Sequence, residues 1–140
     1  MSAPRIINGI IFSDLGQAST FMALDWVRRA LAQCLGFAPF PATLNVRPAN
    51  DEDGLAWESI RNDASLFSHM PSHEGSCRAR VYRVEVQCGA HSGNRKTPAA
   101  VLFPEVKDYP KDKIEIVAPM RLKDAFGVKD GDPITLEFIH

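Results

Sequence analysis

The sequence predicts a mainly β protein that forms one small barrel of about six strands, with one longer and one short helix. Two observations lead to this fold class. Short segments rich in Ile, Val and Phe alternate with turns that contain Gly, Pro or Asp, which is typical of β-strands. Only one segment carries apolar residues at sustained helical spacing. We expect the strands to close into a barrel, because closure removes the exposed sheet edges of so short a chain.

Composition favours a single domain over residues 1–140 and argues against several classes of function. A net charge of −1 gives no broad attraction to nucleic acid or to anionic lipid, so we expect neither as a partner. No apolar stretch reaches the roughly 18 residues of a membrane-spanning helix, and no signal-peptide pattern precedes the first strand. The cysteines include no C-x-x-C pair, which favours reduced thiols. We therefore expect a cytoplasmic protein, and the composition leaves its oligomeric state open.

The first half of the chain contains the clearest helix. Residues 5–12 predict a strand with a bulge at Gly9, and residues 43–46 predict a second, short strand. Between them, apolar residues recur at helical spacing over residues 24–35, and Gly36 supplies a left-handed stop. Because the first strand begins so early, we expect no N-terminal DNA-binding domain within this chain.

The second half of the chain supplies the remaining strands. Before most of these strands, residues 48–76 are expected to form a long polar loop with at most one short helix. Disorder of this segment is the open alternative. We interpret the acidic run 51–53 as a solvated turn. A short helix is expected to begin at Pro119 and to end at Gly127. The apolar residues change phase near Val81, which predicts a β-bulge there. The strands predicted in this half are residues 77–86, 99–103, 113–117 and 134–139.

Two polar residues at the second strand are candidate metal ligands. Thr43 and Asn45 follow a proline-rich segment, and residues two apart on an extended strand point to the same side. A hydroxyl and an amide oxygen suit Mg²⁺ when phosphate and water complete its coordination. Spacing alone favours the simpler interpretation, a polar strand face without a ligand. Glu115, which interrupts an apolar strand, either points to solvent or accepts hydrogen bonds from a ligand in a pocket.

The loop of residues 13–20 is a candidate phosphate site. It lies between a predicted strand and a predicted helix, where backbone N–H groups can surround a phosphate. It contains one glycine, Gly16, so its residues alone favour an ordinary surface connection.

Three motifs in this order resemble the archaeal-type CTP-dependent riboflavin kinase family over nearly the whole chain. They are a Ser-x-Leu-Gly loop after the first strand, Leu-Gly-Phe-x-Pro-Phe-Pro-x-Thr-Leu-Asn at residues 35–45, and Ile-Glu-Ile-Val-Ala-Pro at residues 114–119 followed by Lys-Asp-Gly-Asp at residues 129–132. The resemblance implies a six-stranded cradle-loop, Greek-key-like barrel. It also implies transfer of the terminal phosphate of CTP to the 5′-hydroxyl of riboflavin, which gives FMN and CDP.

The resemblance further implies a set of site residues. Thr43 and Asn45 would hold Mg²⁺, and Lys107 and Glu115 would contact the flavin. Phosphoryl transfer depends mainly on positioning and on neutralisation of charge, so no dedicated general base is implied. The residues that would bind the nucleotide are Leu15, Gly16, Gln17, Ala18, Ser19, Thr20, Met120, Arg121, Leu122 and Lys123.

The chain departs from the family pattern at several positions. Asp14 and Ala18 replace outer glycines of the family's first loop, and Ala42 replaces the glycine before the Thr-Leu-Asn triplet. Lys107 occupies the position of a threonine that touches the flavin. Side chains, one of them acidic, stand where backbone would approach phosphate. The alternative function is therefore a non-catalytic protein that binds a flavin or another phosphorylated small molecule on the same barrel.

Overall fold

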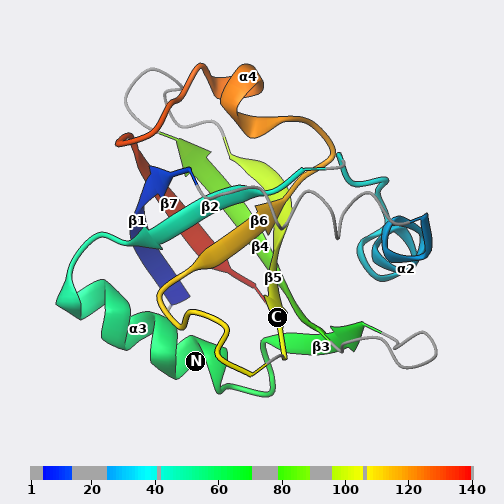
Figure 1. Cartoon of the computed structure of the whole chain (residues 1–140), viewed down its shortest axis with the longest axis horizontal. Coiled ribbons are helices and arrows are strands. Elements are labelled where there is room, and N and C mark those ends of the chain that lie inside the picture. The colour runs from blue at the N-terminus through cyan, green and yellow to red at the C-terminus, as the bar shows by residue number, and fades with distance from the viewer. Residues whose placement is uncertain are drawn as a thin grey trace.

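An antiparallel sheet closes on itself to form a barrel, as the sequence predicts (Figure 1). The protein is described by a computed structural model over residues 5–13, 25–40, 42–70, 79–88, 96–105 and 107–139. The strand order is β3-β4-β5-β6-β2-β1-β7, and β4 also pairs with β7, so all strands except β3 form a ring of six. The strands are β1 (Arg5–Phe12), β2 (Leu44–Pro48), β3 (Phe67–Met70), β4 (Ala79–Cys88), β5 (Thr97–Pro104), β6 (Ile114–Val117) and β7 (Pro133–Phe138).

Strand β4 closes the barrel because it has two partners along one edge. Its first residues pair with β3, and its last residues, from Val84 to Cys88, pair with β7. Its other edge pairs with β5 along almost its whole length. The β4–β5 register is continuous, so the bulge predicted near Val81 is wrong. The apolar residues change phase along the sequence because both faces of β4 are buried. Tyr82 faces the barrel interior, whereas Val81 faces outward and packs with Leu31 and Leu35.

Gly9 lies in a continuous register as well, so the bulge predicted there is also wrong. It pairs with Pro48 on one side and with Ile134 on the other. A Cβ atom at this position would collide with Val46 Cγ1 and lie 2.9 Å from the carbonyl oxygen of Arg47. The glycine is needed for the close approach of β1 to β2.

Three helices surround the barrel in the part of the chain that the structure describes, one more than predicted. They are α2 (Asp25–Leu35), α3 (Asp51–Arg61) and α4 (Leu122–Phe126). Figure 1 shows α3 across one end of the barrel, α4 at the other end and α2 against its side. Helix α2 ends at Gly36, which has a φ of 79°, as predicted. Helix α4 begins after Arg121, later than predicted, and ends at Gly127 with a φ of 64°.

Helix α3 corrects the interpretation of residues 48–76. The side chain of Asn50 caps the helix by accepting a hydrogen bond from the backbone N–H of Asp53 at 2.8 Å. The acidic run 51–53 forms the first turn of the helix, where negative charge is favourable; Asp51 and Glu52 are exposed as predicted, but they lie in a helix and not in a loop turn. Trp57 and Ile60 are buried against the barrel.

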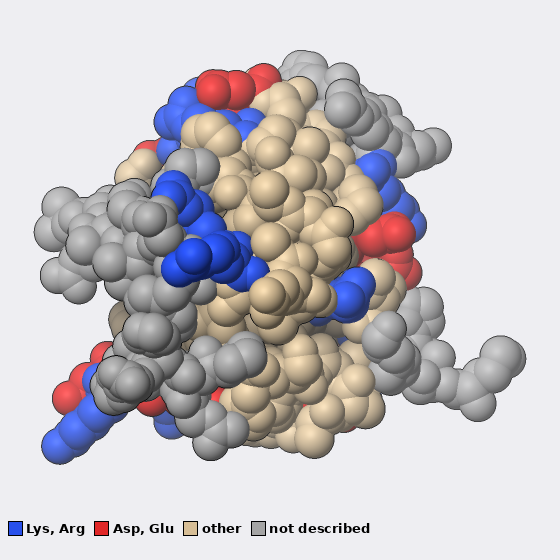
Figure 2. Space-filling view, turned by 90° about the vertical axis from the view of Figure 1, so that its right-hand side faces the viewer, with Lys and Arg blue, Asp and Glu red and all other residues tan. Residues whose placement is uncertain are grey.

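Two apolar clusters hold these layers together. One fills the barrel interior, and the other joins Leu31 and Leu35 of α2 to the outer face of the sheet at residues such as Val81, Leu102 and Val117. Figure 2 looks onto the side of the molecule that carries α2 and shows a mainly uncharged centre, with Lys and Arg on both its left and its right part. None of the helices in the described ranges is long and apolar enough to cross a membrane.

Candidate functional site

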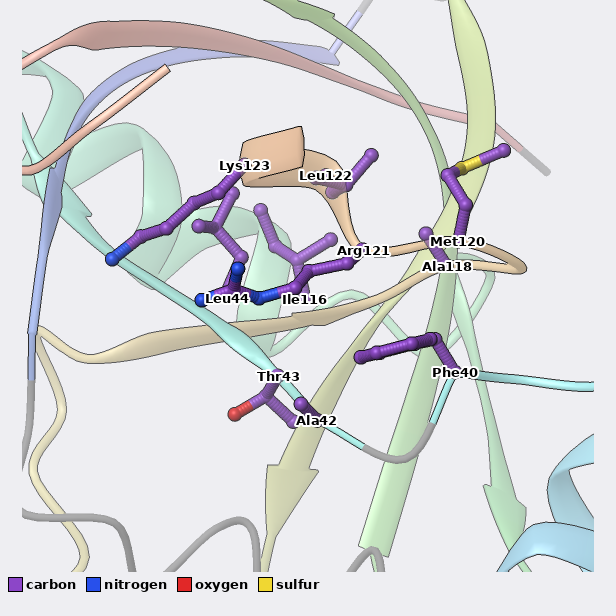
Figure 3. Close-up of a pocket in the computed structure, with 10 residues that line it drawn as sticks. All are labelled: Phe40, Ala42, Thr43, Leu44, Ile116, Ala118, Met120, Arg121, Leu122 and Lys123. Atoms are coloured by element: carbon purple, nitrogen blue, oxygen red, sulfur yellow. The ribbon is translucent and has the colours of Figure 1, made fainter. Parts of the chain in front are cut away.

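A pocket opens between β2, β6 and α4 (Figure 3). Its cavity volume is about 30 Å³, so it is a shallow pocket, and its floor consists of aliphatic side chains such as Leu44, Ile116 and Leu122. Arg121 and Lys123 add two basic side chains on the α4 side. The complete lining is Phe40, Ala42, Thr43, Leu44, Ile116, Ala118, Met120, Arg121, Leu122 and Lys123. An apolar floor with few polar groups is the usual make-up of a small-molecule site.

Phe40 reaches over this pocket from the segment before β2. Its backbone N–H donates a hydrogen bond of 2.8 Å to the carbonyl oxygen of Ala118, which ties the segment to the end of β6. Its own carbonyl oxygen accepts a hydrogen bond of 2.8 Å from the N–H of Ala42. The side chain remains 36% exposed, and Figure 3 shows Phe40 and Arg121 reaching over the pocket on two sides of Ile116. Phe40 belongs to the motif at residues 35–45 but was not among the predicted site residues.

The basic side chains of the pocket are paired with carboxylates. Arg121 Nη1 lies 3.0 Å from an oxygen of Asp124, and Lys123 Nζ lies 2.9 Å from Asp130 Oδ1. Ser13 Oγ donates a hydrogen bond to the other oxygen of Asp130. The Ser13 hydrogen bond, followed by the contacts with Lys123, lowers the pKa of the Asp130 carboxyl below its usual value. The end of β1 and the start of α4 are thereby linked beside the pocket.

Asn45 and Glu115 lie next to each other on the opposite side of β2 and β6 from the barrel interior. They are direct partners in the β2–β6 register. Asn45 Oδ1 is buried and has no hydrogen-bond partner among the residues that the structure describes. A buried acceptor without a partner is costly, and a ligand or ion can satisfy it. Thr43 lies two residues before Asn45, directly before β2, and a hydroxyl and an amide oxygen are donor types that suit a hard cation such as Mg²⁺.

Glu115 is held by two neighbours that the sequence analysis did not identify. Its side chain is only 8% exposed, and Lys113 Nζ lies 3.3 Å from Oε1. The hydroxyl of Tyr109 donates a hydrogen bond to the same oxygen. Lys113 precedes Glu115 by two residues, so strand alternation was a usable signal for it. No local pattern indicates Tyr109, because it comes from the turn before β6.

The structure brings together some of the predicted site residues and separates others. Met120, Arg121, Leu122 and Lys123 line one pocket with Thr43. Asn45 and Glu115 lie together on the neighbouring face, outside the pocket lining. Lys107 is exposed in the turn after β5 and does not line the pocket. The predicted phosphate loop, residues 15–20, lies outside the described residues.

Comparison with known proteins identifies the family. A family model named for the CTP-dependent riboflavin kinase, with the description "domain of unknown function DUF120", matches residues 11–138. A riboflavin kinase of Methanoregula boonei is 32% identical over 129 residues, which cover 92% of this chain and 55% of the relative. A riboflavin kinase of Pyrobaculum arsenaticum is 31% identical over 141 residues, covering 94% of this chain and 59% of the relative.

A riboflavin kinase of Saccharolobus solfataricus is 31% identical over 135 residues, which cover 94% of this chain and 72% of the relative. The chain thus spans between about half and three quarters of the length of these curated relatives. Because the family match extends over almost all of the barrel, the chain belongs to the CTP-dependent riboflavin kinase family.

Proposed function

We propose that this chain transfers the terminal phosphate of CTP to the 5′-hydroxyl of riboflavin and releases FMN and CDP. The observation that carries the proposal is the position of Asn45, whose buried and unpartnered Oδ1 lies beside Glu115 and two residues from Thr43 of the pocket. Family membership and relatives named riboflavin kinase support the acceptor, and the family name supports the nucleotide.

The pocket between β2, β6 and α4 would bind the nucleotide. Its aliphatic floor and the exposed ring of Phe40 suit a base, since every nucleobase offers a flat face to an aromatic ring. Arg121 and Lys123 would attract the phosphates. To bind them, each side chain would have to exchange its present carboxylate partner for a phosphate oxygen. Residues 15–20 remain proposed phosphate contacts through the resemblance to the family.

Thr43 and Asn45 would hold the metal, which we propose is Mg²⁺. A bound cation would neutralise charge on the phosphates during transfer. Thr43 lines the nucleotide pocket, directly precedes β2 and comes two residues before Asn45. It therefore links the proposed nucleotide site to the Asn45–Glu115 pair.

Glu115 would meet the flavin, because it is an oriented carboxylate next to the proposed metal ligand. Lys107, carried over from the family pattern, would reach the flavin only from the exposed turn before Tyr109. We assign no residue as the proton acceptor.

The test is chromatographic detection of FMN after incubation of the protein with riboflavin, Mg²⁺ and CTP, ATP, GTP or UTP in separate reactions. We expect FMN with CTP and a loss of FMN in the Thr43→Ala variant. If FMN forms only with another nucleotide, the proposed phosphate donor is wrong and the proposed phosphorylation of riboflavin stands. Retention of riboflavin without FMN in any reaction would refute the kinase proposal and favour the non-catalytic binding protein that the replaced glycines at Asp14 and Ala18 suggest.

A further inference from the structure

The turn between β5 and β6 is fixed to α3 by two hydrogen bonds to one carbonyl oxygen. Trp57 Nε1 donates to the carbonyl oxygen of Lys111 at 2.8 Å, and Arg61 Nη1 donates to the same oxygen at 3.1 Å. Both donors come from α3, and both side chains are nearly fully buried. A turn held by two buried donors has little freedom to shift relative to the helix.

Phe103 provides the second attachment of this turn. The Tyr109 ring packs edge-on against the Phe103 ring, with 5.3 Å between their centroids. The Phe103 and Trp57 rings also pack edge-on, with 6.2 Å between their centroids. The guanidinium carbon of Arg61 lies 5.6 Å from the centroid of the Phe103 ring. A continuous group of aromatic and cationic side chains therefore extends from α3 to Tyr109.

The backbone of this turn is also unusual. Asp108, directly before Tyr109, has a φ of 66° and is the one non-glycine residue with positive φ in the described ranges. Asp is one of the few non-glycine residues that adopts this left-handed conformation readily, so Asp108 forms a tight turn directly before Tyr109.

The group that this turn aims is the Glu115 carboxylate. Tyr109 donates its hydroxyl hydrogen to Glu115 Oε1, and Lys113 Nζ lies 3.3 Å from the same oxygen. A carboxylate is planar, so fixing Oε1 from two directions also fixes the direction in which Oε2 accepts hydrogen bonds. Helix α3 thus determines the orientation of Glu115 through the turn.

We propose that Tyr109 is a positioning residue for the flavin acceptor: anchored to α3 through Lys111 and Phe103, it orients Glu115 to receive a hydrogen-bond donor of the flavin. This inference rests on the proposed function. It adds a residue that the family motifs did not indicate, and it gives α3 a role in acceptor binding. The nucleotide pocket shares none of these residues, so the effect is confined to the acceptor.

The test compares riboflavin affinity and CTP affinity in the Tyr109→Phe variant, which keeps the ring on Phe103 and removes only the hydroxyl. Quenching of riboflavin fluorescence gives the Kd for riboflavin without any need for turnover. Steady-state FMN formation gives the KM for riboflavin and the KM for CTP. We expect the Kd and KM for riboflavin to rise roughly tenfold, because a hydrogen bond to a charged group is lost, with the KM for CTP unchanged.

Tyr82→Phe is the matched control, since Tyr82 is the other tyrosine of the chain. Its hydroxyl donates to the carbonyl oxygen of Arg61 at 2.7 Å and does not contact Glu115. Its loss should lower stability and leave the Kd for riboflavin unchanged. Trp57→Phe removes the indole donor to Lys111 and should raise the Kd for riboflavin less than Tyr109→Phe does, because Arg61 keeps its own bond.

Each outcome separates this inference from the proposed reaction. A Kd for riboflavin in Tyr109→Phe within about twofold of wild type overturns the inference, and so does an equal rise in the KM for CTP. If wild type binds riboflavin but makes no FMN, the kinase proposal fails and the Kd comparison still decides the role of Tyr109. Failure of wild type to bind riboflavin at all overturns both.

Discussion

Asn45 on β2 lies directly opposite Glu115 on β6, so an amide oxygen without a partner and an oriented carboxylate are neighbours on one face of the sheet. Cross-strand partners in an antiparallel pair have Cβ atoms about 5 Å apart. The proposed metal ligand and the proposed flavin contact are therefore close enough to act on the two ends of one transfer. This pairing sets the first prediction.

Replacing Asn45 by leucine should separate stability from function. Asn45→Leu keeps the approximate size of the side chain and removes an acceptor that has no partner in the described structure. We expect the free energy of unfolding without metal to stay the same or rise by about 1 kcal/mol, because an unsatisfied buried group is lost. FMN formation should require at least tenfold more Mg²⁺, because the loss of a direct ligand should weaken metal binding at least as much as the roughly tenfold lost with an outer-shell partner. Urea denaturation and a Mg²⁺ titration of FMN formation measure the two effects.

Asn62→Ala is the control for this experiment. Asn62 is an exposed amide that follows α3, and its Nδ2 donates to the carbonyl oxygen of Glu58 at 3.0 Å. The Asn62→Ala variant should need the same Mg²⁺ concentration for FMN formation as the wild type. An unchanged Mg²⁺ requirement in Asn45→Leu would show that Asn45 does not hold the metal.

Phe40 should contribute to nucleotide affinity through its ring. Phe40→Ala is expected to raise the KM for CTP about tenfold, since stacking of a base on an aromatic ring contributes roughly 1–3 kcal/mol. Phe40→Tyr should keep most of the affinity. Leu55→Ala is the control, because Leu55 is 68% exposed on α3, outside the pocket lining. A KM for CTP in Phe40→Ala equal to that of Leu55→Ala would contradict the assignment.

Sequence patterns predicted most of the regular elements but did not locate α3, and they missed the short strand β3 at Phe67–Met70. Residues 5–12 form β1 with the predicted bounds, and the helix predicted over residues 24–35 is confirmed over Asp25–Leu35 together with its stop at Gly36, because local periodicity and one glycine determine them. The sequence analysis allowed at most one short helix within residues 48–76 and did not locate the 11-residue α3, because its apolar stripe is short: Leu55 is exposed, and Trp57 and Ile60 carry the apolar burial. Asn50 followed by acidic residues was the available signal.

The candidate site divides in the same way. The pair Thr43 and Asn45 could be proposed from two-residue spacing, since alternation along a strand is a local property. The pairing of Asn45 with Glu115 depends on sheet register, which the motifs alone do not specify. Tyr109 could not be predicted at all, because its position depends on contacts between its turn and α3, about 50 residues earlier.

Two glycine substitutions should change stability in opposite directions. Gly9→Ala is expected to cost about 1–3 kcal/mol, because its Cβ would collide with Val46 and crowd the backbone of Arg47. Gly54→Ala should stabilise by about 0.5–1 kcal/mol, since Gly54 lies within α3 and no atom lies within 4 Å of an added Cβ. Urea denaturation of both variants measures this. Equal stabilities would contradict the close approach of β1 to β2.

Asp130 should give the link between β1 and α4 a defined pH dependence. The hydrogen bond from Ser13, supported by Lys123, lowers the pKa of Asp130 below its ordinary value of 3.8. A carboxyl with a lowered folded-state pKa stabilises the fold above the ordinary pKa, and the contribution disappears as the pH falls through the folded-state pKa. Asp130→Asn should therefore be less stable than wild type at neutral pH, and the difference should shrink in acid.

Urea denaturation of wild type and Asp130→Asn between about pH 7 and pH 2.5 measures this difference. The difference should be constant near neutral pH and should fall only at the acid end of the range, because the pKa of Asp130 is lowered. Ser13→Ala removes the largest cause of the lowered pKa and keeps the carboxylate, so its deficit should also be largest at neutral pH. Because Asp130 is exposed, solvent screens its interactions and the deficits should be small. A deficit in Asp130→Asn that stays constant from neutral pH to acid would show that the carboxylate does not stabilise this link through its charge.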